Sequence, residues 1–186
     1  KETAGKLEEF LGQFFDLGPG YVTVVVTKDE IILNHVMGTR NDETKMPLTP
    51  DTPIYIASQT KSYMGLLAAK LHEKGILSLD DKITDHWLNI KFSEGVDPSI
   101  WSLRELISHM GPIEIDYITF MEAYVTELDY RNYPDLIAKH AVKRDEGFQY
   151  DNLGCNLYSA ILHKATGKSW REWLDSEIFI PLGFTK

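Results

Sequence analysis

Ser58 stands three residues ahead of Lys61 in the stretch IASQTKSYMG, residues 56–65, where extended-looking residues give way to a helical pattern. Side chains three residues apart lie on the same side of a helix, so the hydroxyl and the amine can meet. The positive end of the helix and partial burial would both lower the pKa of Lys61, which could then accept the serine proton. The pair therefore predicts a serine nucleophile with an amine base, and first-turn backbone N–H groups would stabilise an oxyanion.

The same pair has a plainer interpretation. Serine is favoured at a helix N-cap regardless of chemistry, and Lys61 would then be a solvated surface charge. So short a pattern also arises often by accident. Its placement favours chemistry, because the apolar lead-in, residues 54–57, is expected to deliver Ser58 from a buried segment. The next turn is expected to be small and close-packed, with Ser62, Tyr63 and Gly65.

Tyrosine can pass a proton to the leaving atom of such a reaction, and two Tyr-x-Asn triplets could supply one. Tyr130-Arg131-Asn132 lies in a charged, turn-like stretch, whereas Tyr150-Asp151-Asn152 directly precedes a predicted helix. A helix start fixes the side chains of the loop that leads into it. The second triplet is therefore the better candidate, and Tyr130 remains an alternative for a structure to eliminate.

The N-terminal third predicts a helix and a hairpin. Residues 21–27 and 31–36 are rich in β-branched side chains, and a short polar link joins them. Residues 38–53 are dense in turn formers and predict a loop. Before the hairpin, residues 3–16 predict an amphipathic helix that ends at Gly18-Pro19-Gly20, with an apolar face made of Leu7, Phe10, Leu11, Phe14 and Phe15.

The chain after Ser58 predicts helices throughout. One covers residues 58–74 and is closed by Gly75 in a left-handed conformation, and another covers residues 152–164. Capping boxes at Ser102 and Ser169 mark further helix starts. No convincing third strand follows residue 60, so the hairpin, marginal alone, needs helices or further strands to cover it.

Composition excludes several classes of function. The 186 residues are 43% hydrophobic and 25% charged, which is typical of a soluble globular protein of one or two small domains. A formal charge of −9 without clustered Lys and Arg argues against a nucleic-acid partner. There is no apolar run of bilayer length and no signal segment at Lys1, where the absence of an initiator Met suggests a piece of a longer protein.

No metal or cofactor is predicted. The six histidines show no metal-ligand spacing such as His-Glu-x-x-His, and no Gly-rich phosphate loop is present. His109 lies beside the predicted cleft and is interpreted as structural. Cys155 is predicted to be a buried thiol rather than a second nucleophile, because no base lies near it in the sequence.

Together these motifs resemble the serine β-lactamase and penicillin-binding-protein superfamily, in the branch of class C β-lactamases, D-alanyl-D-alanine carboxypeptidases and related esterases. Residues 47–83 are similar to that branch's Ser-x-x-Lys region, and residues 102–111 to the segment before its inter-motif loop. Residues 148–184 look like its second-motif helix pair, which ends in Pro-Leu-Gly. The resemblance covers nearly the whole chain.

The resemblance implies a role for each matching residue. Ser58 would be the acylated nucleophile and Lys61 its proton acceptor, with the Ser58 backbone N–H as half of an oxyanion hole. Tyr150 would relay protons to the leaving group and help to activate water for deacylation. Asn152 would orient the substrate amide and the lysine, and Gln59 is assigned to substrate binding.

The implied fold is an incomplete α+β, β-lactamase/transpeptidase-like fold. Residues 1–57 would be the N-terminal part of the sheet domain, and residues 58–186 the Ser-x-x-Lys helix with the helical domain. The family's third motif, Lys-Thr-Gly or His-x-Gly on a strand, has no convincing match. His109-Met110-Gly111 fits the letters but follows a helix, and Gly111-Pro112-Ile113 replaces the family's usual Ser-Gly.

The chain is therefore expected to be the N-terminal portion of a longer serine hydrolase that acts on a peptide, β-lactam or small ester or amide. Alone it would be inactive, and the edge of strand 21–27 would associate with another chain or with the missing part. The resemblance also implies a periplasmic, secreted or cell-envelope protein. The alternative is a non-catalytic binding or regulatory module on the same scaffold, against which the joint presence of Ser58, Lys61 and Tyr150 argues.

Overall fold

A computed structural model describes residues 2–14, 18–92 and 94–184. The chain divides into two compact units, Lys1–Tyr55 and Ile56–Lys186. Each unit has its own set of elements and is described by itself. The domain boundary predicted between residues 57 and 58 stays a prediction.

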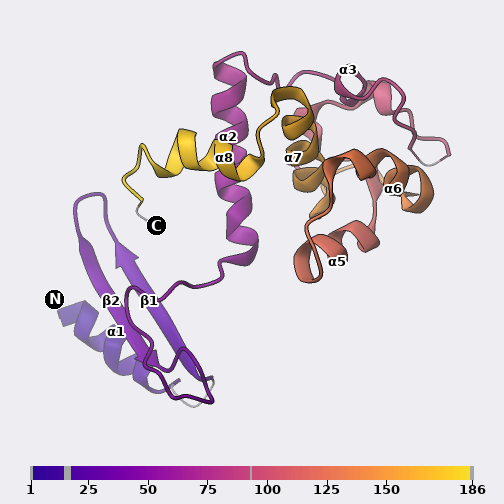
Figure 1. Cartoon of the computed structure of the whole chain (residues 1–186). Helices are drawn as coiled ribbons and strands as arrows, with labels where there is room; N and C mark the ends of the chain where they lie inside the picture. Colours follow the sequence, from indigo (N-terminus) through magenta and orange to yellow (C-terminus); the bar gives the residue numbers. More distant parts are fainter. Residues whose placement is uncertain (1, 15–17, 93, 185–186) are drawn as a thin grey trace. The chain divides into compact units, whose positions relative to one another are not determined.

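The first unit consists of a helix and a hairpin (Figure 1). Helix α1 covers Glu2–Gly12, and it ends earlier than predicted. The N–H groups of Gln13 and Phe14 turn back to carbonyls three residues before them, at 3.2 and 3.0 Å, as in a tightened last turn. None of the residues of α1 is buried, and the predicted position of Phe15 lies outside the described residues.

The predicted hairpin is confirmed. Strands β1 (Gly20–Val26) and β2 (Ile31–Gly38) are antiparallel, in register from Gly20 opposite Gly38 to Val26 opposite Ile31, with an irregularity at Val25 and Val26. Gly38 has a φ of +88°, and a Cβ there would lie 2.1 Å from the Pro19 carbonyl oxygen. Only glycine fits where the strands come so close. A loop follows β2, as predicted.

The second unit is mostly helical. Helix α2 follows a 3-10 turn, η2, and ends as predicted with Gly75 at a φ of +66°. There the Ile76 N–H donates to the Leu71 carbonyl and the Gly75 N–H to the His72 carbonyl, which is a Schellman motif. The elements are η2 Ala57–Gln59, α2 Thr60–Glu73, α3 Ile83–His86, η3 Pro98–Ile100, α4 Leu103–Ile107, α5 Asp116–Tyr124, η4 Tyr130–Asn132, α6 Tyr133–His140, α7 Leu153–Thr166, α8 Trp170–Leu174 and the π-helical turn η5 Asp175–Phe179.

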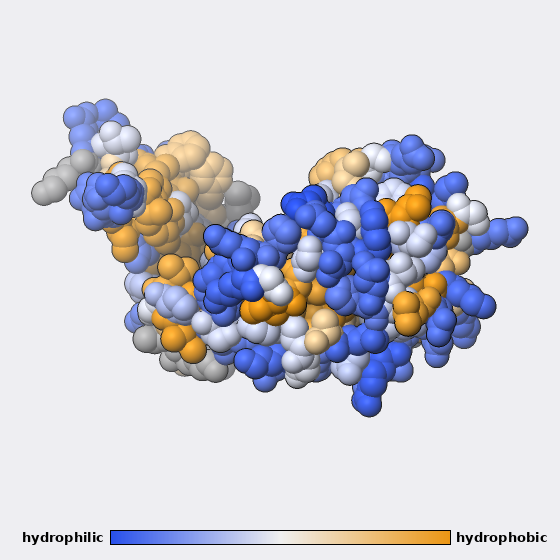
Figure 2. All heavy atoms as spheres, turned by 90° about the horizontal axis from the view of Figure 1, so that it is seen from above, coloured by the Kyte–Doolittle hydropathy of each residue, from blue (hydrophilic) through white to orange (hydrophobic). Residues whose placement is uncertain are grey.

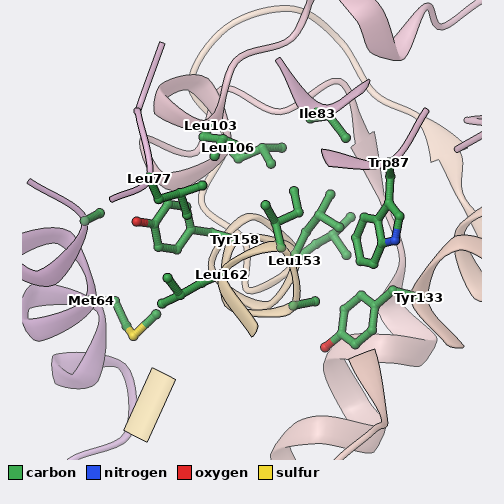
Figure 3. Packing of buried hydrophobic residues seen from close by; sticks show 14 of the residues in the cluster. Met64, Leu77, Ile83, Trp87, Leu103, Leu106, Tyr133, Leu153, Tyr158 and Leu162 are labelled. Carbon is green, nitrogen blue, oxygen red and sulfur yellow. The ribbon is translucent and has the colours of Figure 1, made fainter. Parts of the chain in front are cut away.

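Helix α7 forms the centre of this unit. Figure 3 shows Leu153, Tyr158 and Leu162 projecting from it in different directions into the surrounding apolar side chains. Burial of each large aliphatic side chain contributes about 1.5–3 kcal/mol, so packing around α7 dominates the stability of the unit. The side chains that meet there come from α2, from α3 and the residue after it, and from α4 and α6, among them Met64, Ile83, Trp87, Leu103, Leu106 and Tyr133.

Both predicted capping boxes are present. Ser102 and Glu105 exchange hydrogen bonds at the start of α4, and Ser169 and Glu172 do so at the start of α8. The expectation that no strand follows residue 60 is wrong. Residues Ile113–Glu114 (β3) and Val142–Lys143 (β4) form a short antiparallel ladder. Two-residue strands leave no alternating pattern to detect in a sequence.

The visible surface is largely hydrophilic, with separate apolar patches (Figure 2). Within the residues that the structure describes, no helix is both long and apolar enough to cross a bilayer.

Candidate active site

Ser58 lies inside the 3-10 turn that leads into α2. The residue before it, Ala57, has a φ of +46°, a left-handed conformation that an alanine adopts only at a cost of about 1–3 kcal/mol. Neither N-cap residue, Ile56 nor Gln59, caps its helix with a side chain. The strained turn thus places the exposed Ser58 hydroxyl on the side of Lys61 and not at a capping position.

The lead-in to Ser58 does not have the predicted burial. Ile54, Tyr55 and Ile56 are exposed by 52%, 83% and 42%, and this stretch pairs with no strand among the described residues. The predicted close packing of the next turn is also wrong at Gly65, where a Cβ would meet no atom within 4 Å. Burial therefore does not explain the placement of Ser58.

Lys61 connects the two predicted motifs. Its Nζ donates to Ser58 Oγ at 3.0 Å, the contact expected for residues three apart at a helix start. The same nitrogen donates to Asn152 Oδ1 at 2.5 Å. Asn152 is the last residue before α7, so one amine bridges two segments 91 residues apart.

Tyr150 completes the group. Its phenol lies beside Ser58 and Lys61, and hydrogen bonding from Ser58 first and from Lys61 second lowers the pKa of the phenol below its usual value. The Lys61 Nζ also lies 4.9 Å from the centre of the Tyr150 ring. Tyr150 is 60% exposed, so the three polar groups lie at a surface open to a substrate.

Tyr130 lies elsewhere. It belongs to η4, and its ring packs against that of His163 with 4.4 Å between the ring centres. It lines a small cavity with Tyr133, His163 and Trp170, none of which belongs to the Ser58 group. The structure therefore brings Tyr150, and not Tyr130, to Ser58.

Two further predicted residues lie next to this group. Gln59 follows Ser58 and is exposed at the start of α2, and its role in substrate binding stays a prediction. Cys155 is buried in the first turns of α7, and burial raises the pKa of its thiol to about 11. Cys155 is thus a protonated, packed thiol at neutral pH, as its sequence context predicted.

A buried ion pair behind Tyr150 was missed by sequence reasoning. Arg144 Nη1 donates to Asp151 Oδ2 at 2.6 Å, and their side chains are only 3% and 15% exposed. The only sequence signal was Asp151 itself, between the two motif residues. Among the described residues no group of three His, Cys, Asp or Glu side chains could hold a metal ion.

The profile of the Beta-lactamase family matches residues 15–186. The chain belongs to the Beta-lactamase family. Penicillin-binding protein 4* of Bacillus subtilis (strain 168) is 26% identical over 193 aligned residues, which cover 100% of this chain and 39% of that protein. The predicted superfamily is thereby confirmed.

Two solved structures confirm the β-lactamase/transpeptidase-like fold. The octameric penicillin-binding protein homologue from Pyrococcus abyssi is 30% identical with a TM-score of 0.76, over 96% of this chain and 43% of that one. D-amino acid amidase from Ochrobactrum anthropi SV3, complexed with D-phenylalanine, is 25% identical with a TM-score of 0.77, over 97% and 49%. This Beta-lactamase family chain therefore spans less than half the length of each relative.

Proposed function

We propose that this protein is a serine hydrolase that works through an acyl-enzyme at Ser58. The observation that carries the proposal is that Lys61 Nζ donates to both Ser58 Oγ and Asn152 Oδ1 and lies 4.9 Å from the centre of the Tyr150 ring. A nucleophile, a base and a proton carrier in mutual contact are the parts that acyl transfer requires.

Each residue has a defined step. Lys61 accepts the Ser58 proton as Oγ attacks the substrate carbonyl carbon, and the carbonyl oxygen becomes an oxyanion facing the backbone N–H groups at the start of the helix. Tyr150 passes a proton to the leaving nitrogen or oxygen as the scissile bond breaks. Water then attacks the acyl carbonyl carbon and the carbon–Oγ bond breaks, which releases the carboxylic acid and returns a proton to Ser58, while Asn152 orients Lys61 and, with Gln59, the substrate.

The proposed substrates are a peptide, a β-lactam, or a small ester or amide. Support comes from the similarity of the chain to a penicillin-binding protein in sequence and to a D-amino acid amidase in structure. We propose in addition that the protein acts outside the cytoplasm, in the periplasm, the cell envelope or the medium. A non-catalytic module on the same scaffold has no need for three polar groups in contact at an exposed surface.

Labelling of Ser58 tests the proposal. The full-length protein is expected to gain the mass of a fluorophosphonate probe or a fluorescent penicillin, located by peptide mapping on Ser58. Ser58→Ala is expected to abolish the adduct, whereas Ser62→Ala, the matched control one turn later and also exposed, leaves it unchanged. An unlabelled full-length protein, or an adduct that survives Ser58→Ala, rules the proposal out.

We further propose that residues 1–186 alone turn over no substrate and associate through the β1 edge. Within the described residues β1 pairs only with β2, and such an edge offers unpaired N–H and C=O groups to another strand. The peptide 1–186 is expected to show concentration-dependent mass by light scattering, reduced by Val24→Lys on β1 and less so by Ile32→Lys on β2. A monodisperse monomer at all concentrations contradicts this proposal.

A further inference from the structure

Arg144 is a charged residue with almost no access to solvent. It follows β4, and its side chain is 3% exposed. Arginine is rarely so buried unless its charge is paired. Its backbone N–H donates to the Pro112 carbonyl at 3.1 Å, which anchors it beside the β3–β4 ladder. Its position is thus fixed by the ladder that the sequence did not reveal.

The guanidinium of Arg144 holds the segment that carries the Tyr-x-Asn triplet at two places. Nη1 donates to Asp151 Oδ2 at 2.6 Å, and Nη2 donates to the Gln149 carbonyl at 2.5 Å. These two residues lie immediately before and after Tyr150. The backbone of Tyr150 is therefore fixed on both sides by one buried cation.

Asp151 transmits this constraint to Asn152 and α7. Its Oδ1 accepts from the Gly154 N–H at 2.8 Å, in the first turn of the helix, while Oδ2 binds Arg144. Its own N–H donates to His109 Nδ1 at 3.3 Å. The middle residue of the triplet is thus tied through its backbone and through both carboxylate oxygens.

His109 links Arg144 to the ring of Tyr150. It has a φ of +60°, and its carbonyl accepts from Arg144 Nη2 at 3.1 Å and from the Gln149 N–H at 3.0 Å. Its ring lies 4.8 Å from that of Tyr150, centre to centre, and 5.8 Å from that of Phe148. A strained residue held by a buried cation therefore supports the exposed tyrosine from behind.

We propose that Arg144 is a positioning residue, which through Asp151 and His109 holds Tyr150 and Asn152 in contact with Ser58 and Lys61. Tyr150 is exposed and lies on a loop, so its own packing does not fix it to the fraction of an ångström that proton transfer needs. The planar fork of Arg144 reaches three acceptors at once, which the single ammonium of a lysine cannot do in the same geometry. The catalytic consequence rests on the proposed function, but the placement of Tyr150 does not.

The experiment compares Arg144→Lys with Arg104→Lys in the full-length protein. Arg104 makes a similar two-donor contact with Asp80, at 2.7 and 3.0 Å, but on an exposed surface of α4. Titration of Tyr150 is followed by NMR of tyrosine labelled with ¹³C at Cζ and assigned with Tyr150→Phe. The other groups around the phenol, Ser58, Lys61, His109 and Cys155, are the same in both variants.

In Arg144→Lys the Tyr150 midpoint is expected to rise toward the usual tyrosine value, because its bonds to Ser58 and Lys61 lengthen, and Ser58 acylation is expected to slow about 100-fold. Arg104→Lys is expected to change neither. An unchanged midpoint and rate in a folded Arg144→Lys overturn the proposal. If the wild type is not acylated at all, the proposed function fails while the titration still decides the positioning role.

Asp151→Asn provides the second variant in case Arg144→Lys does not fold. It keeps an oxygen for the Gly154 N–H but removes the charge that Arg144 binds. The same upward shift of the Tyr150 midpoint is expected. A Tyr150 midpoint unchanged from the wild type in folded Asp151→Asn, or loss of the fold in both variants by circular dichroism, assigns the pair to general stability and overturns the positioning role.

Discussion

Replacement of Lys61 by methionine is expected to slow acylation of Ser58 by about 10²–10⁴-fold, the usual contribution of a positioned general base. Methionine keeps most of the length of the side chain but removes the amine that contacts both Ser58 and Asn152. The serine hydroxyl then loses the amine that would accept its proton. The rate is measured by stopped-flow labelling with the probe that modifies Ser58.

The same variant is expected to raise the pKa of Tyr150, because one of the two hydrogen bonds that lower it is lost. Lys74→Met is the matched control, at the residue that directly follows α2. Its amine pairs with Glu177 at 2.5 Å on a half-exposed surface, so its loss is expected to leave acylation unchanged. Acylation of Lys61→Met at the wild-type rate would assign the base to another group and remove Lys61 from the mechanism.

What the sequence predicted well is governed by local rules. The hairpin follows from two β-branched runs and a polar link, and the helix starts at Ser102 and Ser169 follow from capping boxes that need only four residues. The Ser-x-x-Lys contact at 3.0 Å follows from helical spacing alone. In each case the interacting groups are neighbours in the chain, so the pattern contains the geometry.

What the sequence did not predict depends on contacts between distant segments. Tyr150 and Tyr130 occur in two triplets of the same pattern; the sequence favoured Tyr150 because it precedes a helix, but the contact with Ser58 itself depends on the packing of α7 against the rest of the unit. The burial of Arg144 depends on the β3–β4 ladder, whose two-residue strands carry no periodicity. The exposure of Ile54–Ile56 was misjudged because apolar composition indicates burial only when a partner strand exists.

Gly154→Ala is expected to destabilise the helical unit by about 3 kcal/mol or more, at or beyond the upper end of overpacking substitutions. A Cβ at this position would lie 2.1 Å from the Leu106 carbonyl oxygen and 2.9 Å from its carbon. Both atoms belong to the backbone of α4, so no side chain can move aside. The two helices must therefore separate. This opens the core that they share, to which α4 contributes the fully buried Leu103 and α7 the fully buried Leu157.

Gly65→Ala is the matched control, because Gly65 also lies within a helix, α2, yet a Cβ there meets nothing within 4 Å. This substitution is expected to stabilise the protein by about 0.5–1 kcal/mol through helix propensity. Urea unfolding of both variants measures the difference in their free energies of unfolding. The dependence of that free energy on urea concentration is compared with that of the wild type. Because the Gly154 N–H binds Asp151, a folded Gly154→Ala is also expected to lose the lowered pKa of Tyr150. Equal stabilities of Gly154→Ala and Gly65→Ala would show that α4 and α7 do not approach this closely.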